Sequence, residues 1–217
     1  MIDEERTAVY IESLDGGNTP LLESMEARAI EDGVPIIRRS SQSLLKFLLE
    51  SHKPKRILEV GAAVGFSAIF MATYGPGDVH ITTIENYEKR IVKAHENIAS
   101  AGMADKITLI EADALKTLTE LSEDDSNVYD MIFVDAAKAQ YINYLPYVKK
   151  MLVQGGILVS DNVLFDGDIV QSRYAVRRRD RTIHARMREY LRTLCDDADM
   201  VTTVLPIGDG MTLSVKR

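Results

Sequence analysis

Four residues that could perform chemistry follow two short apolar runs, in the stretches FVDAAKAQY and VSDNV. They are Asp135, Lys138, Asp161 and Asn162. If both runs are neighbouring strands of a parallel sheet, the three oxygen ligands meet at one sheet edge, where Mg²⁺ or a similar hard cation could bind and keep positions for water or substrate. The alternative is structural, with Asp135 capping a helix and Asp161 forming a turn with Asn162.

Lys138 lies three residues after Asp135, so one helical turn could bring its amine to the same site. A lysine beside a dication has its charged form disfavoured, which suits a general base. The alternative is an ordinary solvated lysine. We therefore predict that Lys138 takes a proton from a substrate held near the metal.

A second group of polar and glycine residues follows the strands expected earlier in the chain. Gly61 and Gly65 in LEVGAAVGFSAI flank a turn at which the backbone can approach a ligand, although their spacing is not that of the dinucleotide motif Gly-x-Gly-x-x-Gly. Glu85 ends the second strand, where it can accept hydrogen bonds from both ribose hydroxyls, and Asp113 ends the third, where it could receive an adenine amino group. Each could also be a polar cap. Together they favour a nucleoside-containing cofactor.

The elements that must position these residues alternate between strand and helix. We expect an amino-terminal helical layer over 1–51, then strands at 56–60, 80–84, 107–111, 131–134 and 157–160, with helices from about 65, over 89–101 and through 144–152. The runs VTTVLP and MTLSV flank a glycine-containing turn and predict a terminal antiparallel hairpin. This pattern predicts an α/β fold, a mostly parallel sheet with helices on both faces.

Composition indicates one globular domain over 1–217. The chain has 217 residues, 46% hydrophobic and 27% charged, and no internal repeat. The start MIDEERTAVY does not resemble a signal peptide and no apolar run is long enough to cross a bilayer, so we expect a cytoplasmic protein with no membrane partner. The single cysteine, Cys195, excludes an internal disulfide framework and a clustered cysteine metal site.

The cofactor motifs resemble those of class I S-adenosylmethionine-dependent methyltransferases. Glu59 and Gly61 begin the first motif of that group, Glu85 takes the place of its ribose-binding acid, and EADA matches its adenine-side motif. The resemblance implies a Rossmann-like sheet of order 3-2-1-4-5-7-6 with strand 7 antiparallel. It also implies S-adenosylmethionine as cofactor, bound by Glu59, Gly61, Ser67, Glu85, Asp113 and Asp135.

Asp-x-x-Lys followed by Asp-Asn resembles the cation-dependent O-methyltransferases, the group that includes catechol and caffeoyl-CoA O-methyltransferases. This resemblance implies Asp135, Asp161 and Asn162 as ligands of Mg²⁺ or a similar ion, Lys138 as the base, and a homodimer. Transfer would be a direct displacement that releases S-adenosylhomocysteine. Plant members often have Asp-Ala-Asp-Lys where this chain has Ala137 in place of the second acid, which argues against their phenylpropanoid substrates.

An arginine-rich segment stands out in a chain of formal net charge −7. Between Arg173 and Arg192 there are eight arginines, two acids and no lysine. Arginine offers a planar fork to phosphate and can stack on bases, so this segment suggests an RNA substrate. We expect an insertion over 169–197 that overhangs the metal site and docks through an apolar helical stripe, namely Ile183, Met187, Tyr190, Leu191 and Leu194. The alternatives are a solvated face with internal ion pairs, or a site for a coenzyme A thioester.

The stretches PIIRRSSQSLL and RYAVRRRDRTIHARMREYL are similar to those of bacterial tRNA 5-hydroxyuridine methyltransferases. This resemblance implies methylation of 5-hydroxyuridine to 5-methoxyuridine at the wobble position of the tRNA anticodon loop. The C5 hydroxyl and C4 carbonyl oxygen of that base form a vicinal pair, as in a catechol. Candidate RNA contacts are Arg38, Arg39, Arg177, Arg178, Arg179 and Arg181, although Arg38 and Arg39 could equally pair with acids.

Two other functions remain open on the sequence. One is a small-molecule O-methyltransferase acting on catechols or hydroxycinnamoyl-CoA. The other is a non-catalytic nucleotide- or RNA-binding module, against which the intact Asp135, Lys138, Asp161 and Asn162 argue.

Overall fold

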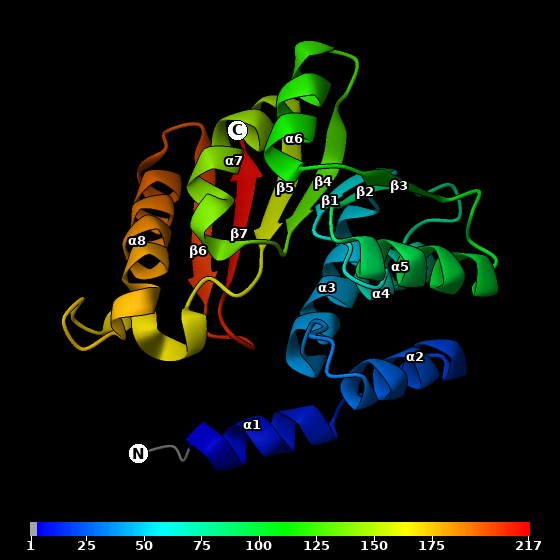
Figure 1. Cartoon of the computed structure of the whole chain (residues 1–217), viewed down its shortest axis with the longest axis horizontal. Coiled ribbons are helices and arrows are strands. Elements are labelled where there is room, and N and C mark those ends of the chain that lie inside the picture. The colour runs from blue at the N-terminus through cyan, green and yellow to red at the C-terminus, as the bar shows by residue number, and fades with distance from the viewer. Residues whose placement is uncertain (1–3) are drawn as a thin grey trace.

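The computed structural model describes residues 4–217 and has a seven-stranded sheet at its centre (Figure 1). The strands lie in the order β3-β2-β1-β4-β5-β7-β6, and only β7 runs antiparallel to its neighbours. Their bounds are β1 Arg56–Val60, β2 His80–Glu85, β3 Ile107–Glu111, β4 Tyr129–Val134, β5 Leu152–Ser160, β6 Met200–Leu205 and β7 Met211–Lys216. The predicted strand order and terminal hairpin are therefore confirmed.

Helices cover both faces of this sheet. The helix bounds are α1 Glu4–Ser13, α2 Pro20–Glu31, α3 Arg39–His52, α4 Phe66–Tyr74, α5 Glu88–Ser100, α6 Ala114–Glu123, α7 Tyr141–Met151 and α8 Arg181–Asp196. Short 3₁₀ turns are η1 Lys138–Gln140, η2 Phe165–Val170 and η3 Arg178–Asp180. No helix in the part of the chain that the structure describes is long and apolar enough to cross a membrane.

The central strands are buried on both sides, which explains why they read as continuous apolar runs. Ile57 of β1 packs into the core shared with α3, α4 and α5, whereas its neighbour Leu58 packs into the core shared with α6, α7 and α8. Met131 and Ile132 of β4 divide between the two cores in the same way. This period of two fixes the direction of every side chain along the strands and leaves the strand ends for polar residues.

The amino-terminal layer expected over 1–51 consists of three helices, α1, α2 and α3. Thr19 caps α2 by accepting a hydrogen bond from the backbone N–H of Leu22, with Pro20 in the first turn, and Gly33 follows the end of α2 with φ +64°. Residues 1–3 of the predicted layer lie outside the described residues. The loop between α2 and α3 that results from this break lies against the site described below.

Gly61 is the residue that lets the end of β1 approach the end of β4. Its φ is +105°, and a Cβ added to it would overlap the backbone carbonyl of Asp135. The backbone N–H of Asp135 in turn donates to the carbonyl oxygen of Val60, at 3.0 Å. The glycine is thus required for the packing of two strand ends, in addition to any contact with a ligand.

Candidate active site

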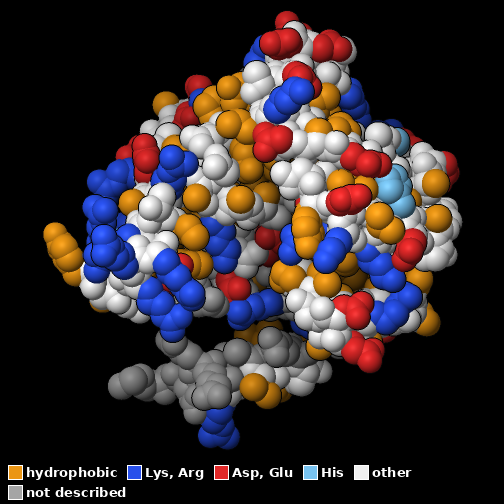
Figure 2. All heavy atoms as spheres, in the orientation of Figure 1, with side chains coloured by type: hydrophobic (Ala, Val, Ile, Leu, Met, Phe, Trp, Pro, Cys, Tyr) orange, Lys and Arg blue, Asp and Glu red, His pale blue; other side chains and the backbone are white. Residues whose placement is uncertain are grey.

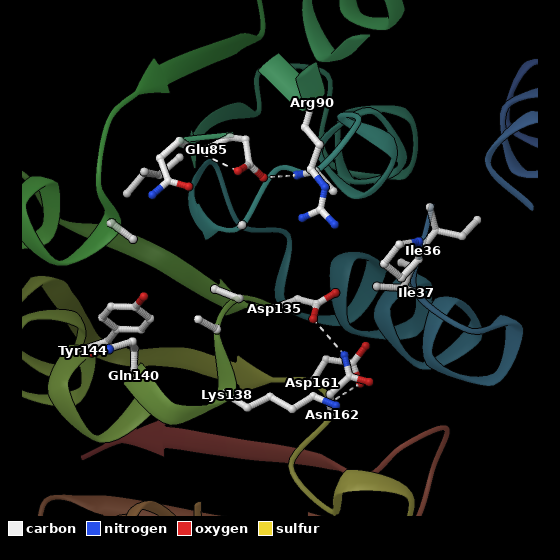
Figure 3. A pocket seen from close by; sticks show the side chains of 18 of the residues that line it. Ile36, Ile37, Glu85, Arg90, Asp135, Lys138, Gln140, Tyr144, Asp161 and Asn162 are labelled. Atoms are coloured by element: carbon white, nitrogen blue, oxygen red, sulfur yellow. Dashed lines mark hydrogen bonds between the residues drawn. The ribbon is translucent and has the colours of Figure 1, made fainter. Parts of the chain in front are cut away.

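A cavity of about 880 Å³ lies at the carboxyl ends of the parallel strands. Figure 3 shows Asp135, Lys138, Asp161 and Asn162 at one end of this cavity and Glu85 with Arg90 at the other. The α2–α3 loop contributes Ile36 and Ile37, which the sequence did not single out. Two of the residue groups predicted from the sequence therefore share one continuous space.

The expected metal ligands converge from the ends of β4 and β5. The Asn162 side-chain amide nitrogen donates to an Asp135 carboxylate oxygen at 2.8 Å, and Asp161 accepts a hydrogen bond from the backbone N–H of Asn162 at 2.7 Å. Asn162 has φ +62°, a conformation that asparagine tolerates better than most residues. Asp161 and Asn162 therefore form the turn that the sequence offered as a structural alternative to a metal site. The same turn brings both side chains beside Asp135.

Burial dominates the electrostatics of the two carboxylates. It raises the pKa of Asp135, and it raises the pKa of Asp161 to about 7, with the charge of Asp135 as the next largest cause. Two buried like charges are stabilised by a bound cation.

The donor set suits a hard dication. No group of three or more His, Cys, Asp or Glu side chains suited to a metal occurs within residues 4–217, so any metal here would take an amide as its third ligand. A half-turn of the Asn162 amide presents oxygen in place of nitrogen, which would give two carboxylates and one amide oxygen, the kind of ligands that Mg²⁺ accepts. The residues present therefore fit such an ion.

Lys138 begins the 3₁₀ turn η1 that follows β4. Its amine lies 4.8 Å from the ring centre of Phe165, and its positive charge opposes the rise that burial causes in the pKa of Asp135 and Asp161. Lys138 thus lies within electrostatic reach of both carboxylates and lines the same cavity. Phe165 could not be found from the sequence, because nothing in its local pattern indicates contact with a lysine 27 positions earlier.

At the opposite end, backbone N–H groups hold the carboxylate of Glu85 in place. Ala63 donates to one oxygen at 2.9 Å, and Asn86 and Tyr87 donate to the other at 2.9 and 3.0 Å. Each carboxylate oxygen has two lone pairs, so one acceptor position remains, on the oxygen hydrogen-bonded to Ala63. Glu85 is therefore fixed at the cavity wall with room for one further donor, where two ribose hydroxyls were expected.

Asp113 lines the cavity and also caps α6, accepting a hydrogen bond from the backbone N–H of Lys116 at 3.0 Å. Tyr144 of α7 lines the same region. Burial, followed by the charge of Asp113, raises the pKa of Tyr144 to about 12. Asp113 is therefore both a helix cap, as the structural alternative held, and a residue of the cavity wall.

Glu59 and Ser67 were predicted to contact the cofactor, but neither is among the residues that line the cavity. Glu59 is completely buried and accepts a hydrogen bond from the Thr83 hydroxyl at 2.5 Å. Burial raises the pKa of Glu59 to about 7, and the hydroxyls of Ser67 and Thr83 oppose that rise. Glu59 and Ser67 lie together behind the turn after β1, where the Ser67 hydroxyl hydrogen-bonds to Glu59. The strand's alternation turns residue 59 away from the cavity.

Arg38 and Arg39 separate in the structure. Arg38 lines the cavity and forms an ion pair with Asp209 of the β6–β7 turn at 2.5 Å. Arg39 pairs with Glu23 at 2.5 Å and with Glu26, and these bonds raise its pKa. Arg39 therefore pairs with acids of the helical layer, as the alternative held, whereas Arg38 lines the cavity.

The arginine-rich segment lies beside the cavity, and none of residues 169–197 lines it, so the expected overhang is not observed. His184, Met187, Tyr190 and Leu194 are buried and dock α8, and Arg186 donates to the carbonyl oxygen of Ala139 in η1 at 3.1 Å. The segment is therefore joined directly to the turn that carries Lys138. Ile183 and Leu191 of the predicted stripe are only half-buried.

The arginines of this segment gather on one side of the molecule (Figure 2). Arg177, Arg178 and Arg179 are exposed, whereas Arg181 is half-buried and donates to the carbonyl oxygen of Val176. Among the described residues, the segment's ion pairs are limited to Arg179 with its neighbour Asp180, at 3.5 Å. The alternative of a face neutralised by internal ion pairs is thus not supported for Arg177 and Arg178.

Comparisons with known proteins agree with this geometry. The model of a family described as O-methyltransferase matches residues 17–217. A catechol O-methyltransferase of Niastella koreensis is 31% identical over 163 residues, covering 74% of each chain. A caffeoyl-CoA O-methyltransferase of Stellaria longipes is 32% identical over 171 residues, covering 78% of this chain and 71% of its own.

Among solved structures, the O-methyltransferase TomG of Streptomyces achromogenes, in complex with SAM, superposes with a TM-score of 0.84. It is 26% identical and the match covers 100% of this chain and 99% of TomG. The sheet order and the cavity at the strand ends define a Rossmann-like methyltransferase fold. Within that class, the chain belongs to the O-methyltransferase family.

Proposed function

We propose that this protein is an S-adenosylmethionine- and Mg²⁺-dependent O-methyltransferase that acts on 5-hydroxyuridine at the wobble position of tRNA. The observation that carries the proposal is the convergence of Asp135, Asp161, Asn162 and Lys138 at the end of the cavity, next to a surface of arginines with one ion pair among the described residues. The four converging residues support O-methyl transfer, and the arginine surface supports a phosphorylated substrate.

Glu85 would accept a hydrogen bond from a ribose hydroxyl, and Asp113 with Tyr144 would enclose the adenine at the far end of the cavity. Ile36 and Ile37 cover the space between the two ends and would exclude water from the transfer (Figure 3). Bound S-adenosylmethionine would supply the methyl group on its sulfonium. A homodimer is expected from the resemblance to related enzymes.

Asp135, Asp161 and Asn162 would hold the dication, which supplies two adjacent positions for the acceptor oxygens and lowers the pKa of the acceptor hydroxyl. Lys138 would accept the hydroxyl proton at its Nζ atom, and the oxygen would then displace S-adenosylhomocysteine from the methyl carbon. No covalent enzyme intermediate is required. The roles of these four residues follow from their shared position at one end of the cavity.

A small-molecule O-methyltransferase is the second candidate function, because the similar curated proteins carry catechol and caffeoyl-CoA names. The two candidate functions use the same active site and differ in the substrate, which is tRNA in one and a small phenol or its coenzyme A thioester in the other. The exposed Arg177, Arg178 and Arg179 favour a large polyanion, since a free catechol has no use for them.

The test compares methyl transfer to three acceptors at equal enzyme, cofactor and Mg²⁺: hydroxylated tRNA, catechol and caffeoyl-CoA. The proposal predicts a specificity constant for hydroxylated tRNA far above that for either small molecule. Efficient transfer to the phenols with none to tRNA would establish the second candidate.

A further inference from the structure

A second cavity, of about 420 Å³, lies between the end of α2 and the start of α5. Four cationic side chains line it, namely Arg28, Lys89, Arg90 and Lys93, against a single carboxylate, Asp32. This is a local excess of positive charge in a chain whose net charge is −7. Such an excess indicates an anionic ligand, because like charges at close range repel unless something neutralises them.

The cations of this second cavity have few partners among residues 4–217. Lys93 pairs with Glu96 at 3.2 Å on the exposed face of α5, and Arg28 donates to the carbonyl oxygen of Ser24 within its own helix at 3.3 Å. No ion pair of Lys89 or Arg90 occurs within the described chain. Among the described residues Arg28 and Lys89 form no ion pair and line this cavity alone, so their charges are available to a ligand.

The second cavity also offers a flat aromatic surface. Tyr87 lines it with 51% of its surface exposed, and the Arg90 guanidinium lies 5.8 Å from the centre of the Tyr87 ring. Val34, Pro35 and Val64 provide apolar walls. An exposed ring beside several cations is the combination that binds a nucleotide, with the base on the ring and the phosphate on the cations.

The second cavity adjoins the active-site cavity. Pro35 and Arg90 line both of them, so the α2–α3 loop and α5 separate one space from the other. The arginine-rich segment lies on the other side of the active site, next to Lys138, because α8 contacts η1. Cations thus border the active site from two sides.

We propose that the second cavity binds a nucleotide of the RNA substrate that lies outside the active site, with its phosphate on Arg28, Lys89 and Lys93 and its base against Tyr87. The inference rests on the proposed function, because it takes the RNA to be the same molecule whose hydroxylated base enters the active site. The RNA backbone would then be held on both sides of the reacting base, by this cavity and by the arginine-rich segment. Such holding fixes the base relative to Asp135 and Lys138 without a contact to the base itself.

The test measures binding of a synthetic anticodon stem-loop by fluorescence anisotropy over a range of salt concentrations, with methyl transfer assayed in parallel. The variant Arg28→Ala/Lys93→Ala is compared with Lys55→Ala/Lys150→Ala, which removes the same charge and the surface ion pairs to Asp78 and Asp125. Lys55 precedes β1 and Lys150 lies in the last turn of α7, and neither residue lines either cavity. Thermal melting of all proteins checks that they are folded.

For Arg28→Ala/Lys93→Ala we expect RNA binding to weaken about tenfold at low salt and the salt slope to fall by roughly 1, while the control binds as wild type. The KM for S-adenosylmethionine should not change, since neither residue lines the active-site cavity. Tyr87→Ala should weaken binding and Tyr87→Phe should not, because stacking needs only the ring.

Wild-type RNA binding by Arg28→Ala/Lys93→Ala, with wild-type methylation of the stem-loop, would overturn this inference and leave the proposed function standing. Wild-type protein that neither binds nor methylates the stem-loop would overturn both. Coenzyme A is another molecule whose nucleotide phosphate could bind in this cavity, so each protein is also titrated with coenzyme A. If Arg28→Ala/Lys93→Ala weakens coenzyme A binding and leaves RNA binding unchanged, the inference is also overturned.

Discussion

The side-chain amide of Asn162 and the carboxylate of Asp135 meet at 2.8 Å, although 27 residues separate them in the chain. The contact exists because β4 and β5 are adjacent parallel strands, paired as Val134 with Ser160, so that the residues after them emerge at one edge. Two strand ends and one turn are sufficient to bring the predicted oxygen ligands together.

The first prediction concerns the dication. Asp161→Ala removes the buried one of the two carboxylates and should weaken Mg²⁺ or Mn²⁺ binding, measured by calorimetry, by about tenfold to a hundredfold. Methyl transfer should fall with it and should vanish in a chelator, returning when Mg²⁺ is added. Asp125→Ala, at a highly exposed carboxylate, is the control. Unchanged activity in excess chelator would contradict the metal site.

Lys138 is expected to act in the proton transfer. Lys138→Met keeps the length of the side chain and its packing on Phe165 but removes the amine, and it should lower kcat by roughly 100-fold or more. The KM for S-adenosylmethionine should stay near its wild-type value, since the residues proposed to bind the cofactor's nucleoside line the other end of the cavity. A raised KM with an unchanged kcat would assign Lys138 to binding instead.

Gly61 is expected to be required for folding as much as for the cofactor. Gly61→Ala places a Cβ on the Asp135 backbone at φ +105° and should lower the free energy of unfolding by about 2 to 4 kcal/mol. Gly77→Ala is the matched control, because no atom lies within 4 Å of the position that its new Cβ would take, and it should change stability by less than about 0.5 kcal/mol. Denaturant titration measures both. Equal stabilities would mean that β1 and β4 tolerate the overlap.

The arginine segment should supply salt-dependent RNA binding. Replacing Arg177, Arg178 and Arg179 with Ala should raise the KM for tRNA and reduce the salt slope by about 2, at roughly 0.7 per phosphate contact on a single strand. Transfer to catechol should not change, since these residues lie outside the cavity. The charge-matched variant Lys55→Ala/Lys106→Ala/Lys150→Ala is the control. If the arginine variant keeps the wild-type salt slope, these three arginines form a solvent-exposed surface that does not bind RNA.

The sequence was most informative where chemistry and strand periodicity coincide. The strand order, and the placement of Glu85, Asp135 and Asp161 at strand ends, could be predicted because apolar runs stop where polar ligands begin. For the same reason Lys138 could be placed beside Asp135 from spacing alone.

The cavity walls could not be predicted in this way. Ile36, Arg90 and the ion pair of Arg38 with Asp209 reach the site from a loop, a helix and a hairpin turn that only the folded chain brings together. Glu59 was placed at the cofactor by motif, yet strand alternation buries it behind the turn. Local pattern indicates what a residue could do, whereas packing decides what it faces.

The central claim is tested most directly with two synthetic anticodon stem-loops that differ only in one base, uridine or 5-hydroxyuridine at the wobble position. Each is incubated with the protein, S-adenosylmethionine and Mg²⁺, and its nucleosides are analysed by mass spectrometry. The account predicts 5-methoxyuridine from the hydroxylated stem-loop and no methylation of the other. An unmodified hydroxylated stem-loop, under conditions in which the same preparation methylates catechol or caffeoyl-CoA, would contradict it.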